Sequence, residues 1–134
     1  MKWLWMALVA CSLCPSLLLS CQPTRSKSVK PNFAVSTQFD GKWYGQRINI
    51  TSSPRCEPTA ISGSITQGFA DFTLHYNDTQ LTGWVADNGA LRLNSDASSR
   101  HDYVFSGNAG GNEIQGSWSV TTAPCEGTWS VTRQ

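Results

Sequence analysis

Histidine and carboxylate side chains could carry acid–base chemistry in this 134-residue chain, but none of them stands in a catalytic pattern. Arg100-His101-Asp102 has the residue types of a hydrolase site, yet adjacent residues on a strand point to opposite faces and no Gly-x-Ser-x-Gly turn marks a nucleophile. We expect these three residues in a solvated loop. His75 alternates with Phe72 and Leu74, and we expect it to face water. The sequence therefore predicts no catalytic residue and a protein that is not an enzyme.

The five cysteines divide into two groups. Cys11, Cys14 and Cys21 lie in or directly after an apolar N-terminal run, which leaves Cys56 and Cys125 as a lone pair. In an exported domain two such cysteines most simply form a disulfide, and closing a loop of about 70 residues is worth roughly 4 kcal/mol in the chain-entropy model. Neither histidine stands in a metal-site spacing with a cysteine. We predict a Cys56–Cys125 disulfide, with no metal site and no cofactor.

Residues 1–20 have the features of an export signal. Met1-Lys2 is a short positive region, Trp3 to Leu19 is a mainly apolar run, and a small residue follows. Leu18-Leu19-Ser20-Cys21 is typical of the bacterial lipobox, where the chain is cut before a cysteine that then receives palmitate-type acyl chains. The sequence thus predicts a lipoprotein signal peptide and lipidation of Cys21, which anchors the protein in a membrane. The alternative is an ordinary secretory signal with a coincidental cysteine.

Residues 21–38 are polar and predict a flexible linker between the anchor and the domain. By analogy with lipoprotein sorting, Gln22 in place of Asp after the lipidated cysteine favours the outer membrane, with the protein facing the periplasm. The linker carries Arg25, Lys27 and Lys30, whereas residues 39–134 have six basic and nine acidic residues. The formal charge of the whole chain is +1, which gives no electrostatic case for nucleic acid.

From Phe39 onward the chain predicts an all-β domain that occupies residues 39–134. Short runs with period-two alternation are separated by turn residues, and no stretch has a helical stripe. An open sheet would leave two unpaired edges, so we expect a small antiparallel up-and-down β-barrel of about eight strands, with a two-sheet β-sandwich as the alternative. The expected strands are Lys42–Ile50, Ala60–Gln67, Ala70–Tyr76, Gln80–Ala86, Ala90–Asn94, Asp102–Ser106, Glu113–Val120 and Gly127–Arg133.

Two local features qualify this pattern. In the first strand, Trp43 has the opposite parity to Tyr44, Ile48 and Ile50, and a bulge near Gly45 would reconcile them. The glycine-rich stretch Gly107–Asn112 is interpreted as a flexible hairpin loop.

Trp84 is the candidate surface-binding residue. Leu81, Gly83 and Val85 share one parity, and if they point inward the indole of Trp84 is exposed and could anchor a partner. If the register is reversed, Trp84 belongs to the core.

The ends of the domain carry two motifs, Phe39-Asp40-Gly41-Lys42-Trp43 and Cys125-Glu126-Gly127-Thr128-Trp129. With Cys56 after the first strand and Arg133 near the terminus, they make the domain similar to a group of small exported alphaproteobacterial, especially rhizobial, proteins. The resemblance covers the domain but not the leader, and it implies no particular activity. The chain departs from the group at Glu126, where serine is more familiar, and at Arg55.

Two functions from different classes are carried forward. The favoured one is a non-enzymatic cell-envelope lipoprotein whose small barrel binds a protein or small molecule or has a structural role. The alternative is a periplasmic protease inhibitor, because inhibitors of that compartment include small one-disulfide barrels with an N-terminal arm that enters the protease cleft. A hydrolase would need an assembled constellation that the sequence does not offer.

Overall fold

The computed structural model describes residues 29–46, 48–51, 53–96 and 99–134, and within these ranges all regular structure is β-strand. The predicted signal peptide and Cys21 lie outside the described residues. The strands are β1 (Gly41–Gly45), β2 (Asn49–Ile50), β3 (Ile61–Thr66), β4 (Phe69–Leu74), β5 (Thr79–Trp84), β6 (Ala90–Ser95), β7 (Tyr103–Gly110), β8 (Glu113–Val120) and β9 (Cys125–Arg133).

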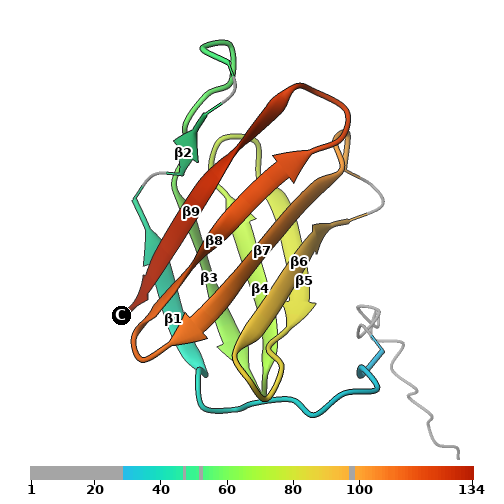
Figure 1. The fold of residues 1–134 in the computed structure, drawn as a ribbon, viewed down its shortest axis with the longest axis vertical. Coiled ribbons are helices and arrows are strands. Elements are labelled where there is room, and N and C mark those ends of the chain that lie inside the picture. The colour runs from blue at the N-terminus through green and yellow to red at the C-terminus, as the bar shows by residue number, and fades with distance from the viewer. Residues whose placement is uncertain (1–28, 47, 52, 97–98) are drawn as a thin grey trace, which may run out of the picture.

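Eight of these strands form a closed antiparallel barrel. Each strand from β3 to β8 pairs with the next one along the chain. β1 pairs with β3 on one side and with β9 on the other, which closes the circuit. The ninth strand, β2, continues alongside β9 (Figure 1). The predicted up-and-down barrel is therefore confirmed.

The seam between the first and last strands contains a bulge. Trp43 pairs with Arg133 and Tyr44 with Thr132, whereas Asn49 pairs with Thr128. Between these pairs the chain advances five residues from Tyr44 to Asn49 but only four along β9, so one extra residue lies between β1 and β2. Because of this residue Trp43 and Ile48, which have opposite parity, are both buried. This is the bulge that the sequence predicted.

The barrel interior is filled by large apolar side chains. Period-two alternation sends every second residue of each strand inward, and these residues form one continuous core. The bulkiest fully buried side chains come from strands around the whole circuit, and they are Trp43, Trp129, Phe72 and Phe105. The Trp129 indole N–H donates a hydrogen bond to the backbone oxygen of Ser106 at 3.0 Å, which satisfies its polar atom inside the wall.

One end of the barrel is closed by the segment that precedes β1. The side chain of Phe39 is buried there, and both oxygens of the Asp40 carboxylate accept backbone N–H groups, from Gln67 at 2.7 Å and Gly68 at 3.0 Å in the β3–β4 turn. The Trp43 indole N–H donates to the backbone oxygen of Phe39 at 2.9 Å. This closed end lies at the bottom of Figure 1.

Arg133 fastens the closed end to the last strand. Its guanidinium lies 5.0 Å from the centre of the Trp43 ring and donates hydrogen bonds to three backbone oxygens, at 2.8 Å to Asp40 and at 3.2 Å to both Gln38 and Gly111. The planar fork of arginine suits several acceptors and an aromatic face at once. Arg133, near the end of β9, therefore holds the same end of the barrel as the opening motif.

Attachment of the N-terminal segment begins before Phe39. The Asp87 N–H donates to the Ala34 oxygen at 2.8 Å, the Ser36 N–H donates to the Val85 oxygen at 2.9 Å, and Val35 forms a β-bridge with Ala86. Residues 34–36, which the sequence placed in the linker, thus pair with the β5–β6 connection.

The glycine-rich stretch Gly107–Asn112 was wrongly interpreted as a loop. Its first four residues, 107–110, belong to β7, where Gly107 pairs with Gly116 and Asn108 with Gln115. A Cβ atom built on Gly107 would lie 2.9 Å from the Trp129 ring, so the glycine leaves room for the packed indole and does not mark a turn.

Substitution of Gly127 tests the seam. A Cβ built at this position would lie well within contact distance of the backbone oxygen of Asn49, across the β2–β9 pair. We predict that Gly127→Ala lowers the free energy of unfolding by about 2–3 kcal/mol, because the strands must separate to admit the methyl group. Gly110→Ala, where nothing lies within 4 Å, is the control and should change stability little. Urea unfolding of the two variants measures the difference, and equal effects would contradict the tight seam.

Arg133→Lys tests the clamp at the closed end. Lysine keeps the charge but cannot reach three oxygens and cover the Trp43 ring together, so we predict a loss of about 1–2 kcal/mol. Arg92→Lys, at an exposed position of β6, is the matched control. Thermal unfolding should separate the two variants, and a Tm for Arg133→Lys equal to that of Arg92→Lys would show that the clamp contributes nothing.

Candidate functional site

The end of the barrel opposite the closed end forms an open mouth. The connections between β2 and β3, β4 and β5, β6 and β7, and β8 and β9 surround it. A cavity of about 200 Å³ opens between these connections. Its lining residues come from strand ends and from the loops that follow them: Ile48, Arg55, Cys56, Glu57, Thr59, Leu74, Tyr76, His101, Tyr103, Trp118, Val120, Ala123 and Cys125.

The floor and the rim of this cavity differ in character. Ile48, Leu74, Trp118 and Val120 form the floor, and each is at most 7% exposed. Around the rim lie charged and aromatic groups, among which Tyr76 is 58% exposed. A group that enters the mouth would therefore leave water for an apolar surface while its remainder stays among polar side chains.

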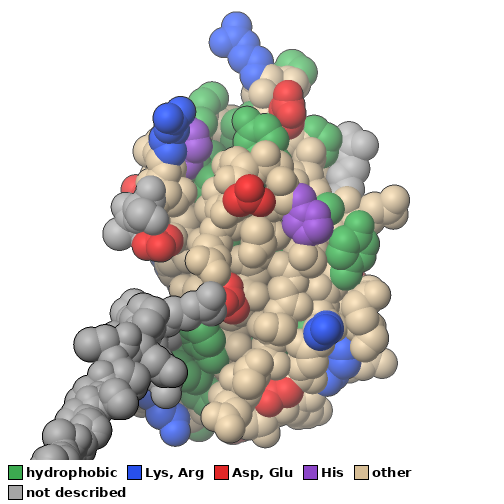
Figure 2. All heavy atoms as spheres, turned by 180° about the vertical axis from the view of Figure 1, so that it is seen from behind, with side chains coloured by type: hydrophobic (Ala, Val, Ile, Leu, Met, Phe, Trp, Pro, Cys, Tyr) green, Lys and Arg blue, Asp and Glu red, His purple; other side chains and the backbone are tan. Residues whose placement is uncertain are grey.

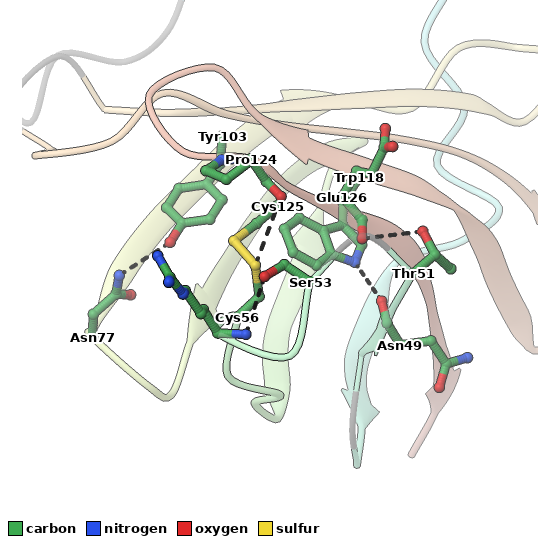
Figure 3. Close-up of a disulfide and its surroundings, with 11 residues drawn as sticks. Asn49, Thr51, Ser53, Cys56, Asn77, Tyr103, Trp118, Pro124, Cys125 and Glu126 are labelled. Atoms are coloured by element: carbon green, nitrogen blue, oxygen red, sulfur yellow. Dashed lines mark hydrogen bonds between the residues drawn. A yellow bond between two sulfur atoms is a disulfide. The ribbon is translucent and has the colours of Figure 1, made fainter.

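The predicted disulfide between Cys56 and Cys125 is present and forms part of this wall. The two Cα atoms lie 5.9 Å apart across 69 positions of sequence. The bond ties the loop after β2 to the first residue of β9, beside the Trp118 side chain and opposite Tyr103 (Figure 3). The connection between β2 and β3 is thereby fixed at Cys56 to the wall of the mouth.

Trp118 is positioned by the seam. Its indole N–H donates to the Asn49 oxygen at 2.9 Å, and next to it both the N–H and the hydroxyl of Thr51 donate to the Glu126 oxygen, at 3.0 and 3.3 Å (Figure 3). The ring stacks on Phe105, with centroids 5.8 Å apart and planes inclined by 17°. Trp118 thus has a fixed orientation, in which it packs on Phe105 in the core and also lines the cavity.

Tyr103 stands at the start of β7, on the other side of the disulfide. Its hydroxyl accepts a hydrogen bond of 3.4 Å from the Asn77 side-chain amide, and its ring lies 6.5 Å from Trp118. The His101 ring packs edge-on against Tyr103 at 6.2 Å. Aromatic side chains from β7, from β8 and from the connection before β7 therefore converge on one opening.

Arg100, His101 and Asp102 form the loop that the sequence predicted, and they do not form a triad. The Nδ1 atom of His101 bonds to the Thr122 hydroxyl at 2.8 Å, and the neighbouring Asp102 is exposed. The role of His101 in the structure is to join the loop before β7 to the turn after β8, at the rim of the mouth.

His75 is exposed, as predicted, and it has a partner that the sequence did not indicate. Its Nε2 atom lies 2.7 Å from the Ser62 hydroxyl, and Tyr44 packs beside it at 6.4 Å. A serine–histidine hydrolase also needs a group that orients the histidine and donors for an oxyanion. Among the described residues Ser62 hydrogen-bonds to the His75 ring, and the pair lies on the outer wall of the barrel. Figure 2 shows one face of the molecule, on which separate charged and histidine side chains lie among uncharged polar surface.

Trp84 lies on the outer face, because Leu81 and Val85 point into the core. The indole is only half-buried, and it packs against Phe69, its neighbour on β4, with ring centroids 5.0 Å apart. Its Nε1 atom is covered and has no hydrogen-bond partner. Of the two registers that the sequence left open, the structure has the one that places Trp84 outside, but the aromatic pair covers much of the surface that an anchor would need.

The described residues contain no group of three or more His, Cys, Asp or Glu side chains that could hold a metal ion. Nor does this part of the chain have a helix long and apolar enough to cross a bilayer. Comparisons of the chain with known protein families, curated proteins and solved structures give no match.

Sequence reasoning missed the mouth itself. It did not single out Trp118, Tyr76, Tyr103 or Glu57 as candidate binding residues. One signal was available, since Cys56 and Cys125 were expected at one end of the first and last strands. In an up-and-down barrel alternate loops gather at that same end, so Tyr76 and Tyr103 could have been placed near the disulfide.

Removal of the disulfide tests its part in holding the mouth. We predict that the double substitution Cys56→Ala and Cys125→Ala lowers the free energy of unfolding by about 4 kcal/mol, the chain-entropy value for a loop of this length. Urea unfolding gives the value. Dithiothreitol should lower the unfolding midpoint of the natural protein to that of the variant and leave the variant unchanged. A natural protein whose midpoint does not respond to the reductant would contradict this.

Proposed function

We propose that the protein is a non-enzymatic lipoprotein of the cell envelope, anchored through Cys21, whose barrel binds a partner at its open mouth. The observation that carries the proposal is the placement of an apolar, aromatic-lined cavity at the end of the barrel opposite the attachment of the N-terminal segment. Ligand sites in small barrels are commonly found at such mouths.

The position of the tether supports an orientation. The chain reaches the closed end at Ala34, through the hydrogen bond to Asp87. The 13 residues from Cys21 to Phe33 span at most about 45 Å when fully extended, which bounds the distance between bilayer and barrel. An anchor on Cys21 therefore attaches the barrel by its closed end, and the mouth lies at the end away from the tether. Outer-membrane attachment facing the periplasm follows from the residue after Cys21 as a further part of the proposal.

The protease-inhibitor alternative makes a different demand on the same segment. An inhibitory arm must be free to enter a protease cleft, whereas residues 34–38 are hydrogen-bonded to the barrel. Only the part before Ala34 would remain as an arm, and acylation of Cys21 would block its terminus. Demonstrated lipidation thus favours the anchored binding protein over the inhibitor.

Lipidation is tested by intact-mass measurement on the protein purified from the membrane fraction of an expressing bacterium. We predict a mature chain that begins at Cys21 and carries the mass of diacylglyceryl and N-acyl groups. Cys21→Ala should accumulate as an unprocessed, unacylated precursor, whereas Cys11→Ala and Cys14→Ala should yield the mature acylated protein, because both positions leave with the signal peptide. A soluble mature protein without acyl mass would overturn the anchor.

A further inference from the structure

We propose that the mouth is a socket for a single apolar side chain, of the size of phenylalanine or leucine, presented by a partner polypeptide. This inference rests on the proposed binding function and names the chemistry of the partner.

The floor of the cavity selects an apolar group. Leu74 and Ile48 are almost fully buried, and Val120 and Trp118 complete the floor beside the disulfide. The Trp118 indole N–H is already used by the Asn49 oxygen, so it offers no free donor to a ligand. A hydrocarbon group gains from leaving water here, and a polar group would lose its hydrogen bonds.

The size of the cavity limits the occupant. Its volume of about 200 Å³ lies below the roughly 300–1,000 Å³ that encloses a drug-sized ligand. A water-sized group takes about 30 Å³, so the cavity has room for six or seven such groups. This number matches the carbon count of a phenylalanine side chain. A larger ligand can place only one such group inside.

The surroundings favour a polypeptide as the carrier of that group. Tyr76 stands 58% exposed at the rim, and Tyr103 is half-buried beside it. Past Tyr76 the surface continues into a polar hollow of about 490 Å³ between the 76–80 turn and residues 96 and 99–101. An apolar pocket with aromatic neighbours and a polar margin is the arrangement that anchors one side chain in a protein–protein interface.

The test is saturation-transfer NMR with N-acetylphenylalaninamide and N-acetylleucinamide as probes and N-acetylglycinamide as the control probe. The full mature protein is used in the state in which it purifies, in lipid nanodiscs if it carries the anchor and free in solution if it does not. Empty nanodiscs supply the background. Failure of the anchor and failure of the socket are therefore observed separately.

We expect transfer to the phenyl and isobutyl protons and none above background to the glycine probe. Ala123→Trp, which places a large side chain in the mouth, should reduce the signal at least tenfold. Ser130→Trp, at an exposed position of β9, should leave the signal unchanged. If near-UV circular dichroism shows that Ala123→Trp is not folded, Tyr76→Ala replaces it, with an expected loss of about threefold from removal of the exposed rim ring.

Three results would overturn the proposal. The first is the absence of transfer to either apolar probe, and the second is a signal that persists in the folded mouth variant. The third is displacement of the amide probes by octanoate at concentrations far below their own, which would assign the mouth to a free lipid-like molecule in place of a polypeptide side chain.

Discussion

The hydrogen-bonded seam between the first strand and β9 is the constraint on which the rest of the structure depends. Without it, an eight-stranded meander has two free edges and no interior; with it, the alternating side chains enclose one core. The seam is specified in detail. One extra residue between β1 and β2 brings both Trp43 and Ile48 inside, and Gly127 allows the Asn49 backbone to approach β9.

The closed barrel has two ends with different physical character. At one end Phe39, Asp40, Trp43 and Arg133 satisfy one another and the neighbouring turns, so that little is left to interact with a ligand. At the other end the disulfide fixes a long connection above an apolar floor and leaves it accessible. The motifs at the two ends of the domain are thus explained by folding. The binding proposal rests on the floor of the mouth, where Leu74, Trp118 and Val120 lie outside those motifs, and Cys125 is the motif residue that also lines the cavity.

Much of the fold could be predicted from the sequence, because the alternation of apolar and polar residues along a strand indicates which side chains are buried. The runs around Phe72, Leu93 and Ile114 gave strands close to those observed, and the parity conflict at Trp43 located the bulge. The prediction of a loop at Gly107–Asn112 was wrong because a glycine can also make room for a packed ring, here that of Trp129. Local composition does not distinguish that role from a turn. The mouth could not be assembled because its residues come from four connections, whose meeting depends on closure. The contact of His75 with Ser62 was missed for a different reason, since it depends on the exact register of the β3–β4 hairpin, past whose end His75 lies.

Native-state hydrogen exchange tests the closure most directly. In a closed barrel the amides of β1 and β9 that hydrogen-bond across the seam are protected as strongly as those of β4, which pairs with β3 and β5 and takes no part in the seam, because opening any of them requires disruption of the whole core. The account predicts comparable protection for β4 and for both seam strands. Amides of β1 or β9 that exchange orders of magnitude faster than those of β4, as at the edge of an open sheet, would contradict it.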